Sequence, residues 1–244
     1  MKSVGSILFV IAWLAFGNSG LADELSFAKE RARMVADILD LWSLTERELE
    51  GRAPDEKVMR VMGKVPRHEF VDASQRKDAY ANRPLPIGYG QTISQPYIVA
   101  LMTALAGVDA QSRVLELGTG SGYQAAVLAE LVSEVYSIEI IAPLAESASK
   151  RLANLGYKNL TVRHGDGYHG WKEKAPFDAV LVTAAASHIP PPLVDQLKVG
   201  GRMVIPVGSG FAVQQLVLVE KLGLDRVRVR QILPVRFVPL TGEH

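Results

Sequence analysis

Three alternating glycines form the stretch of this chain with the clearest chemical meaning. Gly118, Gly120 and Gly122 follow a short apolar run, and a segment with an apolar helical face follows them. A strand, a glycine turn and a helix in this order bring the backbone close to a nucleotide-like ligand, because only glycine permits the dihedral angles and the approach. A second predicted strand, 135–138, leads to Glu139, whose carboxylate can accept hydrogen bonds from both ribose hydroxyls of a nucleoside.

The spacing of the glycines separates two classes of nucleotide site. A dinucleotide site requires its third glycine at the position that Tyr123 occupies here. Glu116, just before the turn, would repel a pyrophosphate and attract a sulfonium or an amino group. The motif therefore resembles the S-adenosylmethionine site of class I methyltransferases, and a nicotinamide dehydrogenase is disfavoured. The alternative is a tight strand–helix turn in some other α/β domain.

Composition narrows the possible functions. The chain has 244 residues, of which 48% are hydrophobic, so one α/β domain can bury a sizeable core. The net charge is +1 and both signs are mixed along the chain, so the sequence lacks the clustered basic face of a nucleic-acid binder. There is no cysteine, and the five histidines show no ligand spacing. We therefore expect neither a metal site nor a nucleic-acid partner.

The elements that must position these residues alternate along the second half of the chain. Segments with helical or β periodicity follow the glycine motif at 143–155, 160–163, 179–182, 190–197 and 200–207. This alternation predicts an α/β fold with a doubly wound, mostly parallel, Rossmann-like sheet. Two further β runs, 213–220 and 226–233, are joined by a short link with a glycine and predict an antiparallel hairpin at the C-terminal edge.

Ligands of such a sheet bind at the carboxyl ends of its strands, which places four predicted site residues on one rim. These are Gly118, Glu139, Asp166 and Thr183. Asp166 can there accept a hydrogen bond from an adenine amino group. The alternative for Asp166 is an Asx turn between two glycines.

A long segment rich in proline and glycine, 80–96, precedes the glycine motif. Ordered loops of this length in compact domains are usually functional, so we expect this one to contribute to the site. Pro96 can begin a helix that continues over 97–105. From the spacing alone, Ser94 is either a functional residue or a plain N-cap of that helix.

The N-terminal segment, 1–22, differs from the rest of the chain. Lys2 is its only charged side chain, residues 4–16 are almost entirely apolar, and small residues lead to Ala22. This order is typical of an export signal that is cleaved after Ala22. The apolar run is short for a membrane span, which needs ~20 residues, so we expect no stable span after cleavage. The alternatives are an uncleaved anchor, an extra apolar helix, or a start codon placed too far upstream.

The remainder, 23–244, is predicted to be a single domain. Residues 23–106 form an N-terminal cap of helices and loops, and residues 107–244 form the cofactor-binding core with the C-terminal strands. Within the cap, a helix is predicted over 23–50 and ended by Gly51. A second short helix follows, through Met62. We expect these elements to cover the ligand edge of the sheet or to pack on its flank.

Several short motifs together resemble the protein-L-isoaspartate O-methyltransferase family from about residue 30 to the C-terminus. They lie at 65–71, 90–96, 116–123, 164–167, 182–185 and 235–240. The glycine motif marks only the superfamily, whereas Thr-Ile-Ser-Gln-Pro at 92–96 and Arg-Phe-Val-Pro-Leu at 236–240 are far more specific. The resemblance implies the class I methyltransferase fold and methyl transfer from S-adenosyl-L-methionine to the free carboxylate of L-isoaspartyl residues in damaged proteins. The methyl ester then begins repair by forming a succinimide.

The resemblance also implies roles for individual residues, carried over by position. Ser94 matches the family's active-site serine. The residues implied at the cofactor are Glu116, Gly118, Gly120, Gly122, Glu139 and Asp166. The residues implied at the peptide substrate are Gln91, Thr92, Ile93, Gln95, Pro96, Thr183, Ala184 and Val238. The chain departs from many members after Ala185, where Ala186 and Ser187 replace a pair of prolines, and this leaves the shape of the peptide-side loop open.

This chemistry suits the residues present. A carboxylate is already ionised at neutral pH and needs no strong general base. The sulfonium is an activated methyl donor, so catalysis can consist of positioning and the exclusion of water. The partners implied are proteins and peptides with isoaspartyl residues, and we expect a monomer. The family is generally cytoplasmic, as the supply of the cofactor is, whereas the N-terminal segment predicts export to the periplasm or the medium.

Three alternatives to this function remain open. One is a methyltransferase acting on another protein or small-molecule carboxylate, and another is a non-catalytic module that binds isoaspartyl sites. The third acts on nucleic-acid bases, but such enzymes place an Asp/Asn-Pro-Pro-aromatic run where this chain has Thr-Ala-Ala-Ala at 183–186. The intact serine and the glycine motif disfavour a module without turnover.

Overall fold

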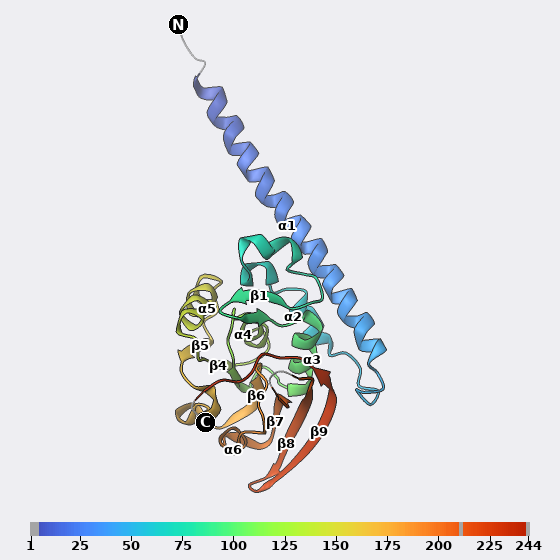
Figure 1. Ribbon diagram of the computed structural model, residues 1–244. Coiled ribbons are helices and arrows are strands. Elements are labelled where there is room, and N and C mark those ends of the chain that lie inside the picture. The colour runs from blue at the N-terminus through green and yellow to red at the C-terminus, as the bar shows by residue number, and fades with distance from the viewer. Residues whose placement is uncertain (1–4, 210–211, 243–244) are drawn as a thin grey trace.

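The computed structural model describes residues 5–209 and 212–242, whose strands form a seven-stranded sheet and a two-stranded hairpin, with helices on both faces of the sheet (Figure 1). The large sheet has the order β5-β4-β3-β6-β7-β8-β9. The strands are β1 (Leu85–Gly88), β2 (Gln91–Ile93), β3 (Arg113–Leu117), β4 (Glu134–Glu139), β5 (Leu160–His164), β6 (Phe177–Val182), β7 (Leu197–Val207), β8 (Gln214–Gly223) and β9 (Arg226–Val235). The helices are α1 (Gly5–Leu44), α2 (Glu56–Met62), α3 (Pro96–Ala106), α4 (Tyr123–Ala129), α5 (Ala142–Asn154) and α6 (Pro191–Asp195).

The sheet is mostly parallel, as predicted. β3 pairs in parallel with β4 on one side and with β6 on the other, and β5 and β7 extend the parallel part. β8 runs antiparallel to β7, and β9 runs antiparallel to β8, so the predicted edge hairpin is confirmed. The chain winds outward from β3 to β5 and then returns to β6 beside β3. This reversal of strand order is where a doubly wound sheet binds its ligand.

Side chains of the central strands alternate between two apolar layers. Val114 and Ala179 pack into the layer that holds α3 and α4. Leu115 and Val180 pack into the opposite layer, with Leu193 of α6. A period of two is the pattern of a sheet that is buried on both faces. On β3, Glu116 has the same parity as Val114, so it points into the layer that holds α3 and α4.

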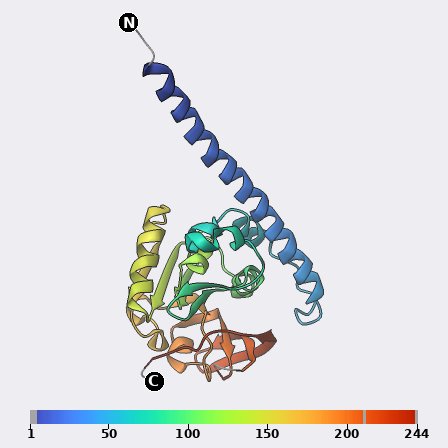
Figure 2. The same ribbon diagram turned by 45° about the horizontal axis from the view of Figure 1, so that its top comes forward.

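The N-terminal helix is longer than the sequence predicts. α1 runs without a break from Gly5 to Leu44 and so passes through the predicted cleavage point after Ala22. Its N-terminal half projects away from the sheet, whereas its C-terminal half lies alongside α3 (Figures 1 and 2). In the part of the chain that the structure describes, no helix is long and apolar enough to cross a membrane. Lys2, the charged residue of the predicted export signal, lies outside that part.

The predicted end of this helix at Gly51 is wrong. The helix ends at Leu44, and turns follow up to Gly51. The Thr45 hydroxyl donates to the Leu41 carbonyl at 3.0 Å, which satisfies a carbonyl of the last turn. α1 and α2 both pack on α3, so of the two placements expected for the cap helices, the flank of the sheet is the observed one.

The loop expected over 80–96 contains a short hairpin that the sequence analysis missed. β1 pairs antiparallel with β2, with Leu85 opposite Ile93. The turn between them has positive φ angles at three successive residues, of which Gly88 and Gly90 adopt them easily and Tyr89 rarely does. These strands are short and contain or adjoin prolines and glycines, so the alternation of apolar and polar side chains typical of a strand cannot be recognised in the sequence. The hairpin leads directly into Ser94 and the start of α3.

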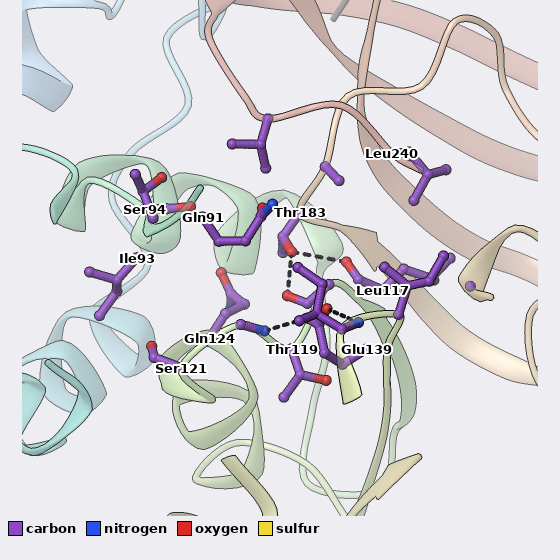
Figure 3. A pocket seen from close by; sticks show the side chains of 18 of the residues that line it. Gln91, Ile93, Ser94, Leu117, Thr119, Ser121, Gln124, Glu139, Thr183 and Leu240 are labelled. Carbon is purple, nitrogen blue, oxygen red and sulfur yellow. Dashed lines mark hydrogen bonds between the residues drawn. The ribbon is translucent and has the colours of Figure 1, made fainter. Parts of the chain in front are cut away.

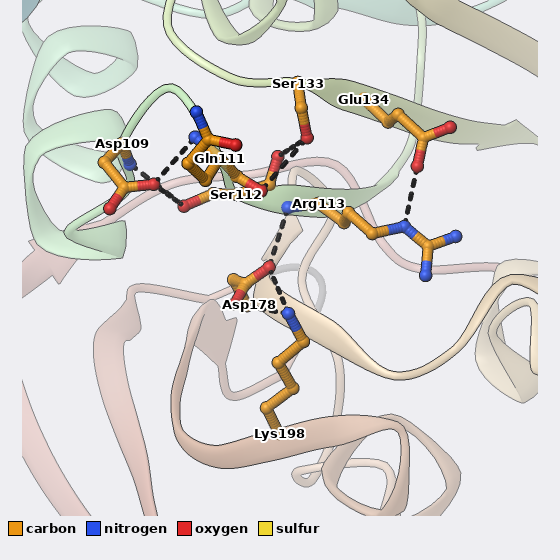
Figure 4. Close-up of polar contacts among 8 residues, drawn as sticks. All are labelled: Asp109, Gln111, Ser112, Arg113, Ser133, Glu134, Asp178 and Lys198. Carbon is orange, nitrogen blue, oxygen red and sulfur yellow. Dashed lines mark hydrogen bonds and ion pairs between the residues drawn. The ribbon is translucent and has the colours of Figure 1, made fainter.

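Polar contacts tie together the amino ends of the parallel strands (Figure 4). The Arg113 backbone N–H donates to Asp178 at 2.8 Å, and the Lys198 ammonium lies 2.8 Å from the same carboxylate. The Arg113 side chain is paired with Glu134 at 2.7 Å. These contacts join β3, β4, β6 and β7 at the edge opposite the carboxyl ends of the strands. Because these residues lie far from the predicted site, substitutions among them can serve as controls for substitutions in the site.

Candidate active site

A cleft lies at the carboxyl ends of β3, β4 and β6, and many of the predicted site residues line it (Figure 3). It encloses about 810 Å³ of empty space, counting the part that is open to solvent. Its walls come from β2 and Ser94, the glycine turn after β3, the end of β4, the start of the loop after β6, and the C-terminal tail. Segments distant in the sequence therefore converge at the point where the strand order reverses.

The glycine turn is held in a shape that only glycine allows at its first position. Gly118 has a φ of +92°, and a Cβ atom there would lie 2.5 Å from the Thr183 hydroxyl. That hydroxyl is within hydrogen-bond distance of the Gly118 carbonyl, at 2.7 Å, and of the Leu117 carbonyl, at 2.9 Å. Thr183 thus ties the loop after β6 to the end of β3. Both Gly118 and Gly120 line the cleft, and their contact with the cofactor stays a prediction.

Glu139 is held at the rim of the cleft by two backbone N–H groups, one from the glycine turn and one from its own loop. One carboxylate oxygen accepts the Gly120 N–H at 2.8 Å, and the other accepts the Ile141 N–H at 2.9 Å. The side chain is only 5% exposed and lines the cleft. A carboxylate has about four acceptor positions, so two backbone bonds leave capacity for two more donors. A nucleoside ribose offers two hydroxyls, so this arrangement fits the cofactor that the fold implies.

Glu116 is placed differently from the other predicted cofactor residues. It is completely buried behind the glycine turn and is absent from the lining of the cleft. The Ser137 hydroxyl donates to one of its oxygens, and the other oxygen has no hydrogen-bond partner among the described residues. Burial raises the pKa of Glu116 to about 8, with a smaller contribution from the charge of Glu139. Its carboxyl group is therefore mostly neutral at pH 7, and its contact with the cofactor stays a prediction.

Gly122 and Asp166 lie beside the cleft without lining it. Gly122 precedes α4 with a φ of +90°, and a Cβ atom there would lie 3.0 Å from a methyl group of Leu152. Asp166 accepts the Tyr168 N–H at 2.9 Å, which is the Asx turn weighed in the sequence analysis. Its neighbour Gly167 does line the cleft, so an adenine contact by Asp166 stays a prediction.

Ser94 stands at the junction of two cavities. One is the cleft described above, and the other is a neighbouring hollow that reaches Pro84, Arg236 and Phe237. Four of the residues that the structure describes line both spaces, and they are Thr92, Ser94, Thr183 and Val238. A methyl donor in the first cavity and a peptide in the second would meet at these residues.

The remaining predicted substrate residues divide between the two cavities. Gln91, Ile93 and Ala184 line the cleft, and Gln95 lines the neighbouring hollow. Pro96 lines neither, because it is buried as the first residue of α3.

Ser94 does not cap α3. The capping position is occupied by Gln95, which forms no side-chain cap hydrogen bond. Instead, the Asn82 side chain accepts the Tyr97 N–H at 3.1 Å. The alternative interpretation of Ser94 as a plain N-cap is therefore wrong, and its hydroxyl is not used to begin the helix.

The structure adds cleft residues that the sequence analysis did not single out. Thr119 and Ser121 stand between the glycines, and Gln124 follows them on α4. For Thr119 and Ser121, the alternation of glycine with small polar residues in the sequence could have indicated a place in the site. Ile141 and Leu240 also line the cleft, and their apolar side chains carry no sequence signal for a ligand.

The loop after β6 explains the departure from the family's proline pair. The Ala186 N–H donates to the Pro206 carbonyl at 3.0 Å, a bond that a proline at 186 could not make. The C-terminal tail pairs with the same loop, since the Ala185 N–H donates to the Val238 carbonyl and the Leu240 N–H donates to the Ala185 carbonyl. This loop and the tail together form one wall of the cleft.

The strand order, the glycine turn and the acidic residue at the end of β4 define a class I S-adenosylmethionine-dependent methyltransferase. The chain belongs to the protein-L-isoaspartate(D-aspartate) O-methyltransferase family, whose sequence model matches residues 43–244. The resemblance described above is thereby confirmed. In the described part of the chain, no group of His, Asp or Glu side chains could hold a metal ion.

Curated relatives are similar over most or all of the chain. Protein-L-isoaspartate O-methyltransferase 2 of Syntrophobacter fumaroxidans is 61% identical over 100% of this chain and 99% of its own length. The protein of the same name from a Polaromonas species is 67% identical over 86% of this chain and 100% of its own length.

Solved structures share the fold. A protein-L-isoaspartate O-methyltransferase has a TM-score of 0.76 at 28% identity, with 87% of this chain and 66% of that chain covered. A Plasmodium falciparum protein described as a beta-aspartate methyltransferase, in complex with S-adenosyl-L-homocysteine, has a TM-score of 0.68 at 24% identity, with 84% and 97% covered. The second likeness bears on the fold alone.

Proposed function

We propose that this protein transfers the methyl group of S-adenosyl-L-methionine to the free carboxylate of L-isoaspartyl residues in damaged proteins and peptides. The observation that carries the proposal is the position of Ser94 between the cleft and the neighbouring hollow. Membership of the protein-L-isoaspartate O-methyltransferase family supports the same reaction. The methyl ester then closes to a succinimide without the enzyme, and hydrolysis of the succinimide restores some normal aspartate.

The residues of the cleft suit the nucleoside part of this cofactor. Glu139 has acceptor capacity for the ribose hydroxyls, and its two backbone bonds hold it in place before any ligand arrives. Gly118 and Gly120 let the backbone approach the ligand closely. When bound, S-adenosyl-L-methionine supplies a methyl group that its sulfonium has already activated.

The protein's part in the reaction is to position the substrate and exclude water. The isoaspartyl carboxylate is already ionised at neutral pH, so no general base is required. The Ser94 hydroxyl can donate a hydrogen bond to one carboxylate oxygen and leave the other free to attack the methyl group. Ile93, Leu117 and Val238 give the cleft apolar walls, which strengthen the polar contacts made inside it.

The reaction predicts a sharp preference between two matched peptides. With labelled cofactor, a peptide that contains one L-isoaspartyl residue should be methylated, and the same peptide with a normal aspartyl residue should remain nearly unlabelled. The reason is that the two carboxylates sit at different distances from the peptide backbone, and the cavity positions only one of them. Equal labelling of both peptides, or of neither, would falsify the proposed function.

The same assay separates the other candidate functions. A methyltransferase of another small-molecule or protein carboxylate would leave both peptides unlabelled while still turning over on its own substrate. A non-catalytic isoaspartyl-binding module would bind the isoaspartyl peptide in calorimetry without releasing any S-adenosyl-L-homocysteine. The family match and the cleft at the carboxyl ends of the strands favour the repair enzyme over both.

Replacing Ser94 should impair turnover and leave cofactor binding close to normal. We expect Ser94→Ala to lower kcat by about 10- to 100-fold, because one positioned hydrogen bond to the reacting group contributes a few kcal/mol at most. Single-turnover kinetics and calorimetry with the cofactor measure the two effects. Ser133→Ala is the matched control, since that hydroxyl donates to the Ser112 carbonyl at the opposite edge of the sheet. Unchanged turnover in Ser94→Ala would remove the proposed role.

The partners proposed are isoaspartyl proteins and peptides, with the protein acting as a monomer and without nucleic acid. The mixed charges and the net charge of +1 support the absence of a nucleic-acid role. Light scattering coupled to size exclusion tests the monomer. A mass of twice the chain at micromolar concentration would contradict it.

We also propose that residues 1–22 are an export signal. Among the described side chains, the residues of α1 that are buried against the rest of the protein lie well after residue 22, at Met34, Ile38 and Trp42. A chain that begins at Asp23 would keep these three buried side chains. The alternative is a cytoplasmic enzyme, which the source of the cofactor favours.

N-terminal sequencing of the protein from its native cells tests this proposal. A chain that begins at Asp23 in the periplasmic fraction is the expected result. An intact Met1, or a later start such as Met34, in the cytosolic fraction would contradict it.

A further inference from the structure

A buried arginine lies directly behind the segment that carries Ser94. Arg67 begins a short 3-10 helix, Arg67–Phe70, and its side chain is completely buried. Its Nη2 atom donates to the Ser94 carbonyl at 2.7 Å, and its Nε atom donates to the Ala79 carbonyl at 2.7 Å. One guanidinium group therefore joins the segment before the β1–β2 hairpin to the residue after it.

This guanidinium is buried without a carboxylate partner. Its hydrogen bonds go to backbone carbonyls, and its central carbon lies 4.8 Å from the centre of the Tyr123 ring. Burial lowers the pKa of Arg67 to about 10, so the group still carries its charge at neutral pH. Nη1 is buried and has no hydrogen-bond partner among the described residues. Burying such a charge is costly, and an apolar side chain would fill the space more cheaply.

Two of the three residues that the guanidinium contacts, Ser94 and Tyr123, line the cleft. Ser94 lines the cleft and the neighbouring hollow, and Tyr123 lines the cleft directly after the last glycine of the turn. The Ser94 carbonyl belongs to the same residue as the hydroxyl that the reaction uses. A donor that fixes this carbonyl limits rotation of the peptide unit and so limits where the hydroxyl points. The charge strengthens the bond, because hydrogen bonds from an ionised donor are about twice as strong as neutral ones.

We propose that Arg67 is a positioning residue for the methyl transfer, which acts by holding the Ser94 carbonyl so that the Ser94 hydroxyl faces the substrate carboxylate. Arg67 itself touches neither substrate nor cofactor, since it lines neither cavity. This inference rests on the proposed role of Ser94.

The test is a double-mutant cycle between Arg67 and Ser94. Arg67→Lys keeps a positive charge but cannot donate to both carbonyls in the planar geometry of the guanidinium. We expect this variant to lose kcat by between about 10- and 100-fold, because small displacements of a reacting group have effects of that size. Its affinity for the cofactor should change by less than about 2-fold. In the Ser94→Ala background the same substitution should cost less than about 2-fold, since the hydroxyl to be positioned is already gone.

Two further measurements separate positioning from a purely structural role. Titration of each preparation with cofactor gives the fraction of folded protein, and kcat is expressed per folded molecule. Arg113→Lys is the matched control, because the Arg113 guanidinium, like that of Arg67, lies near a tyrosine ring, 5.6 Å from its centre. Unlike Arg67, it pairs with a carboxylate, that of Glu134, and it lies at the opposite edge of the sheet. This control variant should lower the melting temperature without changing kcat in either background.

The outcomes distinguish this inference from the proposed function on which it rests. A normal kcat in Ser94→Ala would contradict the proposed role of Ser94, and with it the inference about Arg67. If Ser94→Ala is slow while Arg67→Lys has a normal kcat per folded molecule, the inference about Arg67 fails alone. Additive losses in the double variant would likewise overturn it, because they would show that Arg67 acts independently of the hydroxyl. Where Arg67→Lys does not fold, added guanidinium ions with Arg67→Ala should restore turnover only in the presence of Ser94.

Discussion

Glu116→Gln is expected to flatten the dependence of stability on pH between about 4.5 and 8. The folded state holds a proton on Glu116 up to a pKa of about 8, whereas the unfolded chain releases it near the ordinary value of 4.5. The contribution of this proton to stability is complete below 4.5 and is lost as the pH rises through 8. The parent protein should therefore lose up to about 1.4 kcal/mol of unfolding free energy per pH unit, relative to the variant.

Urea unfolding of both proteins at pH 5.5, 6.5, 7.5 and 8.5 measures this difference. Subtracting one curve from the other removes the contribution of all other groups. Glu134→Gln is the control, because its hydrogen bond with Tyr136 and its pairing with Arg113 lower the pKa of Glu134. The ionised Glu134 carboxylate therefore stabilises the folded protein fully at every pH above about 4.5. The difference in unfolding free energy between Glu134→Gln and the parent should not change over this pH range. Parallel curves for Glu116→Gln and the parent would mean that Glu116 is ionised in the folded protein.

Glu139→Ala is expected to weaken the binding of S-adenosyl-L-methionine by roughly 1.5–3 kcal/mol, the usual contribution of hydrogen bonds to a charged group. That loss corresponds to about 10- to 150-fold in the dissociation constant. The variant removes the acceptor for the ribose and also leaves the N–H groups of Gly120 and Ile141 without their partner. The glycine turn therefore also loses the hydrogen bond from the Gly120 N–H to Glu139.

Calorimetry with the purified variant gives the dissociation constant, and thermal melting without cofactor shows how much of the loss is due to the turn. Glu134→Ala is the matched control, because Glu134 begins the same strand that Glu139 ends and lies at the opposite edge of the sheet. Its cofactor affinity should equal that of the parent. An affinity in Glu139→Ala equal to the parent's would mean that the ribose is held by other residues.

The sequence predicted the part of the site whose geometry depends on the backbone. Gly118, Glu139 and Thr183 meet at the cleft because each lies at the carboxyl end of a parallel strand, and strand ends can be located from apolar periodicity. The position of the strands in the sheet then follows from their alternation with helices. The antiparallel hairpin β8–β9 was predicted for the same reason.

Contacts made by side chains across long sequence distances could not be predicted. Arg67 reaches Ser94 and Ala79 through folding of the whole N-terminal cap, and an arginine in a sequence usually indicates an exposed residue. The burial of Glu116 was missed because its neighbours on β3 suggest a strand but do not show how deep the strand lies. The β1–β2 hairpin was missed because its prolines and its Gly-Tyr-Gly turn resemble an irregular loop.

The pairing of the tail with the loop after β6 bears on how the protein should be handled in the laboratory. Val238, Leu240 and Thr241 form part of the wall of the cleft. An affinity tag or a fluorescent reporter joined directly after Thr241 would begin at the cleft and compete with cofactor and peptide for that space. A fusion directly before Asp23 would attach to α1 instead and leave the cleft free.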